Sequence, residues 1–298
     1  MMRVGLQLLT VGSCRHPACM VTGRLGPGVA TFPAMVGLIH HPGRGAILFD
    51  TGYGAALAAS RDPLARLYRR LLPYQLGPGE ACVHQLAAAG IGVGDLHGII
   101  LSHLHPDHAG GLRDFPGVPI HLTRRALDSL SITRTRERLR LGLLKDLFPD
   151  DMASRVALVD DHAGVSPGGP WAGLGEGRDL FGDGSVVAVD LPGHAPGQIG
   201  LTLTLDNDRA VLLAADAVWQ ARSFRECLEP LRPARYFIHD YPVFLETLHR
   251  LHRVWRDAPN AAIIPSHCEE TLATVGQRPD QAPGTISDSS ARKLPAGS

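Results

Sequence analysis

Four side chains that can bind divalent metals stand within six residues, in the order His103, His105, Asp107 and His108. Imidazole and carboxylate groups are the ligands that zinc and similar borderline ions prefer. In an extended or turning backbone, alternate side chains share one side, so His103 and His105 can reach the same ion. Asp107 and His108 follow Pro106 and can face a second ion. This density of ligand types predicts a metal site.

Three further candidate ligands come later in the chain, each close to the end of an expected strand. His194 lies in a turn rich in Gly and Pro, while Asp216 and His267 each follow an apolar run. A His or Asp at such a place has a well-defined position. Five His and two Asp provide enough ligands for two ions that share one carboxylate and keep positions for water. The predicted metal ligands are therefore His103, His105, Asp107, His108, His194, Asp216 and His267.

The elements that must position these side chains follow from hydrophobic periodicity and turn residues. Alternating or continuous apolar runs predict strands at residues 3–11, 34–40, 46–49, 98–102, 119–122, 185–191, 200–205, 210–215 and 261–265. Helical spacing predicts helices at residues 63–72, 79–89, 124–148 and 242–256. The segment 163–185 is rich in Gly and Pro and is expected to be loop. Strands and helices alternate in two halves, which indicates sheets covered by helices.

The domain organisation is interpreted as one domain over residues 1–276, followed by a disordered tail over 277–298 that is rich in Pro, Ser, Gly and Asp. A basic helical insertion is expected at about 124–150. Residues 124–145 carry seven Lys or Arg against two acids, Asp128 and Glu137, a net charge of +5. This stretch is either a lid that attracts an anionic substrate, such as a phosphate ester or an acyl-carrier thioester, or a solvated helix face.

The composition of the chain limits which binding partners and which cellular location we expect. The formal net charge is zero and aromatic residues make up 5% of the chain, which argues against long nucleic-acid substrates and against a membrane surface. The five cysteines form no CxxC pair, and no apolar run approaches the roughly 18 residues that span a bilayer. We expect a cytoplasmic protein with a small-molecule substrate and no nucleic-acid or membrane partner. The oligomeric state is left open, with a homodimer as one option.

The order HxHxDH, then His, Asp and His, resembles that of the metallo-β-lactamase superfamily. The resemblance covers the chain from about residue 34 to 270. It includes Phe49-Asp50-Thr51-Gly52, which is similar to the family's turn in which an Asp supports the metal loop. The fold implied by the resemblance is an α/β arrangement, an αββα sandwich of two mixed β-sheets flanked by helices.

The resemblance also implies a distribution of ligands. The first ion is held by His103, His105 and His194, and the second by Asp107, His108 and His267, with Asp216 as the bridge. Asp50 is expected to orient a ligand His by accepting its other N–H.

Within the superfamily, the Ala-Gly-Gly after the His cluster and the turn Pro-Gly-His-Ala-Pro-Gly-Gln are most similar to the N-acyl-homoserine lactonases. True β-lactamases of this fold often carry Cys where Asp216 stands. The lactonases commonly carry a Tyr three residues after the bridging Asp, and this chain has Trp219 there, which can donate a hydrogen bond but lacks a phenol. His239 and Tyr241 are further candidate substrate contacts, while Asp240 between them is better explained as a helix cap.

The resulting hypothesis is a hydrolase with two divalent ions, zinc by default and iron or manganese as alternatives. A hydroxide that bridges the ions would attack an ester-type bond in a lactone, carboxylester or thioester. Asp107 is the candidate catalytic residue, placed to relay a proton to the leaving group. A phosphodiesterase of the same fold and a non-enzymatic, ligand-binding regulator with residual esterase activity are the alternatives. Cys268 beside His267 is either a reactive thiol or a buried structural residue.

Overall fold

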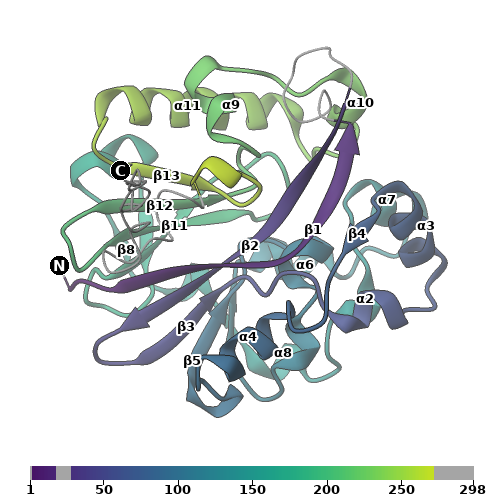
Figure 1. Cartoon of the computed structure of the whole chain (residues 1–298). Helices are drawn as coiled ribbons and strands as arrows, with labels where there is room; N and C mark the ends of the chain where they lie inside the picture. The colour runs from purple at the N-terminus through teal and green to yellow at the C-terminus, as the bar shows by residue number, and fades with distance from the viewer. Residues whose placement is uncertain (1, 18–27, 272–298) are drawn as a thin grey trace, which may run out of the picture.

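The computed structural model describes residues 2–17 and 28–271, which form two stacked β-sheets with helices on both outer faces (Figure 1). Within these residues the first sheet has seven strands, ordered β4 (Tyr74–Gln75), β1 (Gly5–Pro17), β2 (Val29–His41), β3 (Gly45–Phe49), β5 (Leu96–Ile100), β6 (Ile120–Leu122) and β7 (Val156–Leu158). Pairing is antiparallel from β4 to β3 and parallel from β3 to β7.

The second sheet has six strands in the same part of the chain, ordered β13 (Ala262–Pro265), β12 (Ala210–Ala215), β11 (Ile199–Thr204), β10 (Val186–Asp190), β9 (Gly177–Asp179) and β8 (Gly164–Val165). Only the β12–β13 pair is parallel within this sheet. Both sheets are therefore mixed, and the predicted αββα fold is confirmed.

The longer helices are α3 (Pro63–Leu71), α4 (Cys82–Ala88) and α11 (Tyr241–Asp257). The shorter α-helices are α2 (Ala55–Ala59), α5 (Pro106–Ala109), α6 (Arg124–Ser129), α7 (Thr135–Arg140), α8 (Met152–Arg155), α9 (Ala221–Glu226) and α10 (Arg232–Arg235). Single turns of 3₁₀-helix are η1 (Val93–Asp95), η2 (Leu112–Asp114), η3 (Lys145–Leu147), η4 (Val159–Asp161) and the longer η5 (Gly169–Leu174). None of the helices in the described ranges is long and apolar enough to cross a membrane.

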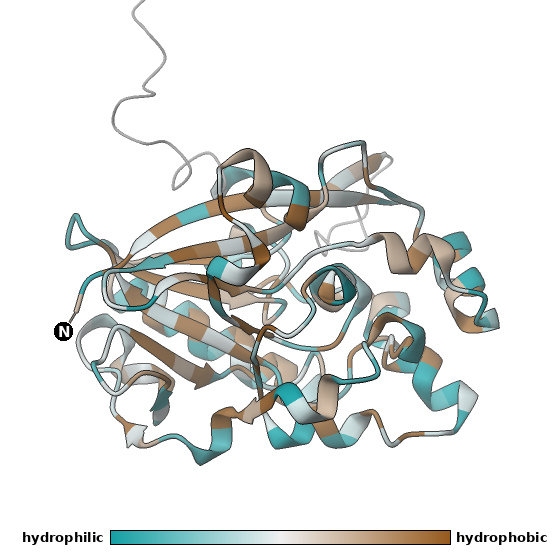
Figure 2. Ribbon diagram, turned by 90° about the horizontal axis from the view of Figure 1, so that it is seen from below, coloured by the Kyte–Doolittle hydropathy of each residue, from teal (hydrophilic) through white to brown (hydrophobic). Residues whose placement is uncertain are grey.

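Alternation along the strands creates the layers. In β3, Ile47 packs between the two sheets, whereas Leu48 packs against the outer helices. In β12, Leu213 faces the other sheet and Leu212 faces α9 and α11. Because strand side chains point to opposite faces, one apolar strand supplies two layers of core. Figure 2 shows the same pattern, with hydrophobic residues along the strands and hydrophilic ones recurring on the surrounding helices.

Two sequence predictions need correction. The predicted helix over residues 124–148 is interrupted: α6 ends at Ser129, α7 begins at Thr135, and Gly142 follows in a left-handed conformation with φ of 60°. Ser and β-branched residues between the two helices disfavour helix. The predicted loop over 163–185 contains η5 and the short strands β8 and β9, which are too short and too rich in Gly to give a periodic signal. The predicted tail, 277–298, lies outside the described residues.

Candidate metal centre

The loop at the carboxyl end of β5 carries the first four candidate ligands. His103 follows the strand, and His105 stands directly before α5, with Pro106 at the first helical position. Proline fits there because its fixed φ suits a helix start and its missing N–H has no partner to lose. The short helix then places Asp107 and His108 in its first turn. The position of Pro106 therefore helps to fix where the helix begins and how the four ligands are spaced.

The second sheet contributes the remaining ligands from three strand ends. His194 follows β10, Asp216 follows β12 and His267 follows β13. Ala215, the residue before Asp216, has φ of 47°, in the left-handed region that is unusual for a residue with a side chain. Asp50, at the end of β3, has φ of 67°. Such backbone strain, at Asp50 itself and at the residue before Asp216, is typical of functional sites.

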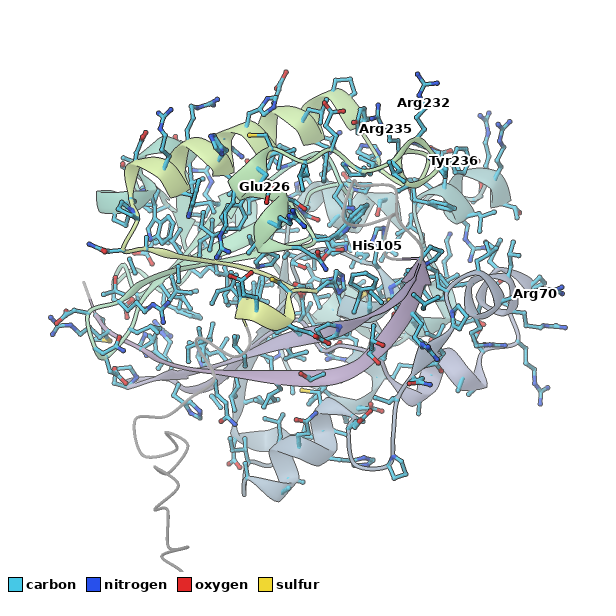
Figure 3. All side chains as sticks on the ribbon, turned by 45° about the horizontal axis from the view of Figure 1, so that its top comes forward. Arg70, His105, Glu226, Arg232, Arg235 and Tyr236 are labelled. Atoms are coloured by element: carbon cyan, nitrogen blue, oxygen red, sulfur yellow. The ribbon has the colours of Figure 1, made fainter. Side chains whose placement is uncertain are left out.

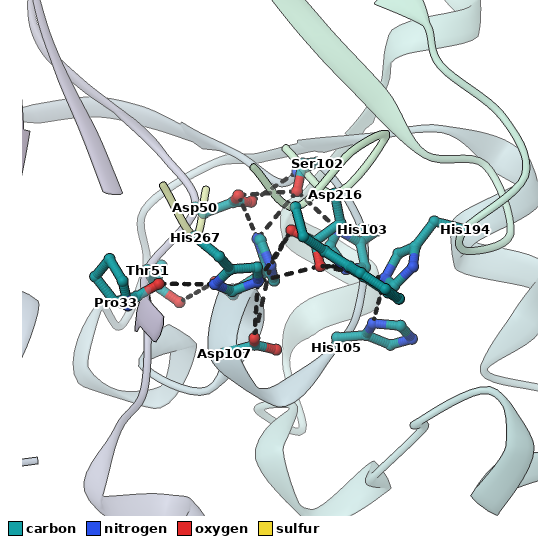
Figure 4. A network of polar contacts seen from close by, with 12 residues as sticks. Pro33, Asp50, Thr51, Ser102, His103, His105, Asp107, His194, Asp216 and His267 are labelled. Atoms are coloured by element: carbon teal, nitrogen blue, oxygen red, sulfur yellow. Dashed lines mark hydrogen bonds and ion pairs between the residues drawn. The ribbon is translucent and has the colours of Figure 1, made fainter. Parts of the chain in front are cut away.

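The structure brings all seven predicted ligands together in two adjoining groups (Figure 4). Within each group, one nitrogen or oxygen atom from every residue lies within 4.8 Å of the others. The first group comprises His103, His105, His194 and Asp216, and the second comprises Asp107, His108 and His267. Loops from both sheets therefore meet at one place.

Asp216 lies between the two groups. Its Oδ1 atom is 3.1 Å from His108 Nε2 and 3.2 Å from His267 Nε2. Its Oδ2 atom is 3.3 Å from His194 Nε2, which belongs to the other group. One carboxylate thus contacts imidazoles of both groups, the arrangement expected of a ligand shared between two ions.

The other ring nitrogen of most candidate ligands is held by a hydrogen bond. His108 Nδ1 is 2.8 Å from Asp50 Oδ2, close enough for the ring N–H to donate to this carboxylate. His267 Nδ1 is 2.7 Å from the Pro33 carbonyl oxygen, to which it can donate. The second Asp50 oxygen accepts from the Ser102 main-chain N–H at 2.8 Å. Such bonds fix the tautomer and leave the opposite nitrogen free to bind a metal.

Two further candidate ligands, His103 and His105, contact supporting groups in the metal loop and in the segment after α7. The Ser102 hydroxyl lies 2.9 Å from His103 Nδ1. The main-chain carbonyl of Leu141 lies next to the His105 ring and favours its protonated form. A Cβ atom on Gly142 would lie 2.8 Å from His105 Cδ2, so the position next to this ligand requires glycine. Sequence reasoning missed these supports, because a contact through a main-chain carbonyl leaves no local signal.

Several buried polar atoms in the site have no hydrogen-bond partner within the described residues. They include His103 Nε2, and also His108 Nε2 and Asp216 Oδ1, which are 3.1 Å apart but lack the geometry of a hydrogen bond. Burying such atoms unpaired is costly, because each loses its bonds to water. All three point into the space that the ligand groups surround, so the side chains present fit divalent metal ions.

Burial and nearby carboxylates shift the pKa values of the candidate ligands in opposite directions. Burial lowers the pKa of His103 and His194 well below the ordinary value, so both rings are neutral, the form that binds metal. Burial also opposes a charge on His267, but the carboxylates of Asp216 and Asp107 raise its pKa to about 9. The acids thus favour positive charge on one side of the site, as a cation site requires.

The three predicted substrate contacts are placed differently from one another. The Trp219 indole N–H donates to Asp216 Oδ2 at 3.2 Å, so Trp219 contacts the metal site itself. His239 adjoins the site through its main-chain N–H, but its ring contacts Arg125 at 3.1 Å. The Tyr241 hydroxyl donates to Glu229 at 2.6 Å, so its one donor is engaged away from the candidate ligands.

Two neighbouring residues have structural roles. Asp240 accepts from the Val243 main-chain N–H and caps α11, which confirms its interpretation as a cap. Cys268 is 4% exposed, and its sulfur accepts from the Ala221 N–H at 3.4 Å. It is therefore a buried packing residue and not an accessible thiol.

Comparison with known proteins agrees with this geometry. The family described as the metallo-beta-lactamase superfamily matches residues 30–267, and this chain belongs to that superfamily. The N-acyl homoserine lactonase AttM of Rhizobium radiobacter is 26% identical over 253 residues, which span 82% of this chain and 84% of the relative. The prediction of a metal-dependent hydrolase is confirmed at the level of enzyme class.

Solved structures of lactonases share the fold. AiiA of B. thuringiensis, with N-decanoyl-L-homoserine at its active site, aligns with a TM-score of 0.71 at 21% identity, covering 92% of this chain and 97% of that one. AidC, a dizinc quorum-quenching lactonase in complex with a product, aligns with a TM-score of 0.61 at 17% identity, covering 90% and 89% of the two chains. Because these sequence identities are low, the structural similarity shows a shared fold.

Proposed function

We propose that this chain hydrolyses an ester-type bond in a small molecule, with a lactone as the first candidate, and that it uses two divalent metal ions. The observation that carries the proposal is the position of Asp216, whose two oxygens contact imidazoles of both ligand groups. The names of the relatives, lactonases of the AttM and AiiA type, support the choice of substrate class.

In this proposal the first ion is held by His103, His105 and His194, and the second by Asp107, His108 and His267, with Asp216 shared. Zinc is the default metal, because imidazole and carboxylate ligands suit it, while iron and manganese remain alternatives for the same ligand set. A pair of such ions lowers the pKa of water towards about 7 and polarises a substrate oxygen.

Asp107 is proposed to move the proton during the reaction. Its side chain is 13% exposed, against 1% for His108, so it is the more accessible of these two neighbouring groups. Its Oδ2 atom lies 3.4 Å from His267 Nε2, which places it at the edge of the ligand groups. A carboxylate in this position can accept a proton and deliver it to the leaving oxygen.

Trp219 is proposed to orient the shared carboxylate. Its N–H bond to Asp216 holds the Oδ2 atom, and its ring lies edge-on to His194 with centroids 5.8 Å apart. An indole N–H can donate a hydrogen bond, but unlike a phenol it cannot act as an acid. Proton transfer in this chain is therefore assigned to Asp107 alone. We further propose a cytoplasmic location, because the five cysteines include no paired motif.

The proposal is tested by a hydrolysis screen of the zinc-loaded protein with N-acyl lactones, aryl esters, thioesters and bis(p-nitrophenyl) phosphate. We expect turnover above about 1 per second on a lactone or ester. His103→Ala should reduce it at least about a hundredfold, because a ligand matters at least as much as the groups that support it. The matched control is His249→Ala, an exposed residue of α11, which should leave it unchanged. Turnover of the phosphodiester alone, or full activity in His103→Ala, would refute the proposal.

A further inference from the structure

A hollow of about 310 Å³ is lined by Arg134, Arg136, Glu137, Arg140 and Tyr236. We call these five residues the arginine hollow. Four of them belong to α7 and the residue before it, and Tyr236 follows α10, so two segments distant in sequence form it. Figure 3 labels Tyr236 and His105, which lie in the same half of the molecule.

Main-chain contacts connect the hollow with the metal ligands on one side. The Arg140 guanidinium donates to the His239 carbonyl at 3.2 Å. The His239 N–H donates in turn to the His194 carbonyl at 2.9 Å. Arg140 is thus two hydrogen bonds away from a candidate ligand of the first group.

A second connection runs through the end of α7. The main-chain carbonyl of Leu141, the residue after Arg140, lies next to the His105 ring. Gly142 packs against the same ring so closely that a Cβ atom would lie 2.8 Å from it. The helix that carries the arginines therefore ends next to a candidate metal ligand. Its six residues rise only about 9 Å at 1.5 Å per residue, a length that an extended small-molecule substrate can span.

The charge of the hollow is not neutralised by the described residues. Arg134 and Arg136 are exposed and have no carboxylate partner there, and Glu137 is the only acid among the lining residues. Three arginines against one glutamate leave a net charge of +2. Arg138 on the same helix differs, because Asp62 holds its guanidinium at 2.7 Å. The unpaired arginines therefore face the hollow as donors.

An exposed aromatic ring completes the wall. Tyr236 is 44% exposed and lies edge-on to Phe237, with ring centroids 5.3 Å apart. Tyr is enriched at binding surfaces, because it combines an apolar ring with a polar hydroxyl. Apolar surface next to guanidinium groups suits a ligand with a carbon chain and a charged end.

We propose that the arginine hollow binds an anionic group, a carboxylate or a phosphate, at the end of the substrate remote from the bond that is cleaved. Guanidinium groups bind both anions through paired N–H donors. The proposal rests on the proposed function, because it names the class of ester or lactone that the same site accepts. The bare alkyl end of a neutral substrate lacks this contact.

The kinetic test compares p-nitrophenyl monoesters of the dicarboxylic acids from glutaric to suberic acid with the p-nitrophenyl alkanoates of equal length. A parallel arm replaces the terminal carboxylate by a phosphonate and so separates the two anions. The zinc-loaded protein should prefer one anionic series by about tenfold in kcat/KM. Arg134→Gln and Arg136→Gln should each reduce the preference about threefold to fivefold, and raised salt should reduce it too. The matched control, Arg70→Gln, removes an equally exposed charge from α3 and should leave it unchanged.

A binding measurement makes the inference independent of turnover. Calorimetric titration of the zinc-loaded protein with dicarboxylates and with monocarboxylates of equal length should show the same preference and the same loss in both variants. If the protein prefers dicarboxylates in binding but turns over no ester, the result would support anion binding in the hollow and refute the proposed function. If esters are turned over without a preference for either anion, or if both variants retain the preference, the proposed anion binding in the hollow is refuted. The proposed function would then remain intact.

Discussion

Two regions of this protein are rich in histidine, and they differ in what surrounds the rings. One is the candidate metal centre. The other is a cluster in which three imidazoles, of His41, His97 and His121, surround the Phe181 ring, and a fourth, of His162, packs against His121. Ring centroids in this histidine–Phe181 cluster are 5.6 to 6.2 Å apart. Similar numbers of histidines therefore lie close together in both regions.

The difference lies in the carboxylates. In the histidine–Phe181 cluster, Asp183 contacts only one of the four imidazoles, that of His41, at 2.9 Å. Among the described residues, no group of three potential metal ligands lies there. Burial and the neighbouring imidazoles lower the pKa of His121 to about 4, so it packs as a neutral ring. In the metal centre, Asp216 contacts three imidazoles. Converging acids, and not the number of histidines, distinguish a cation site from packed aromatic rings.

The largest effect on metal binding among substitutions outside the ligands is expected for Asp50→Asn. The carboxylate orients His108 and binds Ser102, and loss of such a supporting group typically lowers metal affinity 10- to 100-fold. Competition with a chromophoric chelator measures this affinity. The matched control is Asp183→Asn, which removes the acid of the histidine–Phe181 cluster and should leave zinc affinity unchanged. Equal losses in both variants would contradict the comparison.

A smaller effect is expected for Trp219→Phe. The substitution removes the N–H that donates to Asp216 but keeps an aromatic ring beside His194. One hydrogen bond to a charged group is worth about 1.5 to 3 kcal/mol, and solvent or a substrate can replace part of it, so we expect about a fivefold loss in kcat/KM. Trp255→Phe, on α11 against Phe224, is the control with no expected loss. If Trp219→Phe is as active as the wild type, Trp219 has no positioning role.

His121→Gln is expected to leave metal binding unchanged. It should instead change how the stability of the protein depends on pH. The unfolded state binds a proton at this histidine below about pH 6.5, but the folded state does so only near pH 4. The native protein therefore loses up to about 3 kcal/mol as pH falls from 6.5 to 4. The variant should lose correspondingly less in urea titrations over this range. Parallel stability curves for the two proteins would contradict the burial of His121.

Much of this could be predicted from the sequence, because the signals are local. The spacing of His103 to His108 indicates a metal loop by itself, and His194, Asp216 and His267 were found by their places at strand ends. The strands that deliver them are apolar runs bounded by turn residues, and they lie within a few residues of the predicted ranges.

The remaining features depend on contacts between distant segments. The Pro33 carbonyl that holds His267 lies in β2, far from its partner in sequence. The contact of Gly142 with His105 requires the end of α7 to pack on the metal loop, which no periodicity reveals. The sequence shows the positive charge of the stretch 124–145. Which of its arginines are paired, as Arg138 is with Asp62, depends on the fold.

The central claim is that Asp216 joins two ligand groups into one centre for two ions. Its most direct test is the metal-to-protein ratio of dialysed protein, measured by plasma mass spectrometry for the wild type and for Asp216→Asn. We predict a ratio near two for the wild type and below about one for the variant, because the substitution removes the carboxylate that both ions share. A wild type that retains one ion or fewer, or a variant that retains two, would contradict the account.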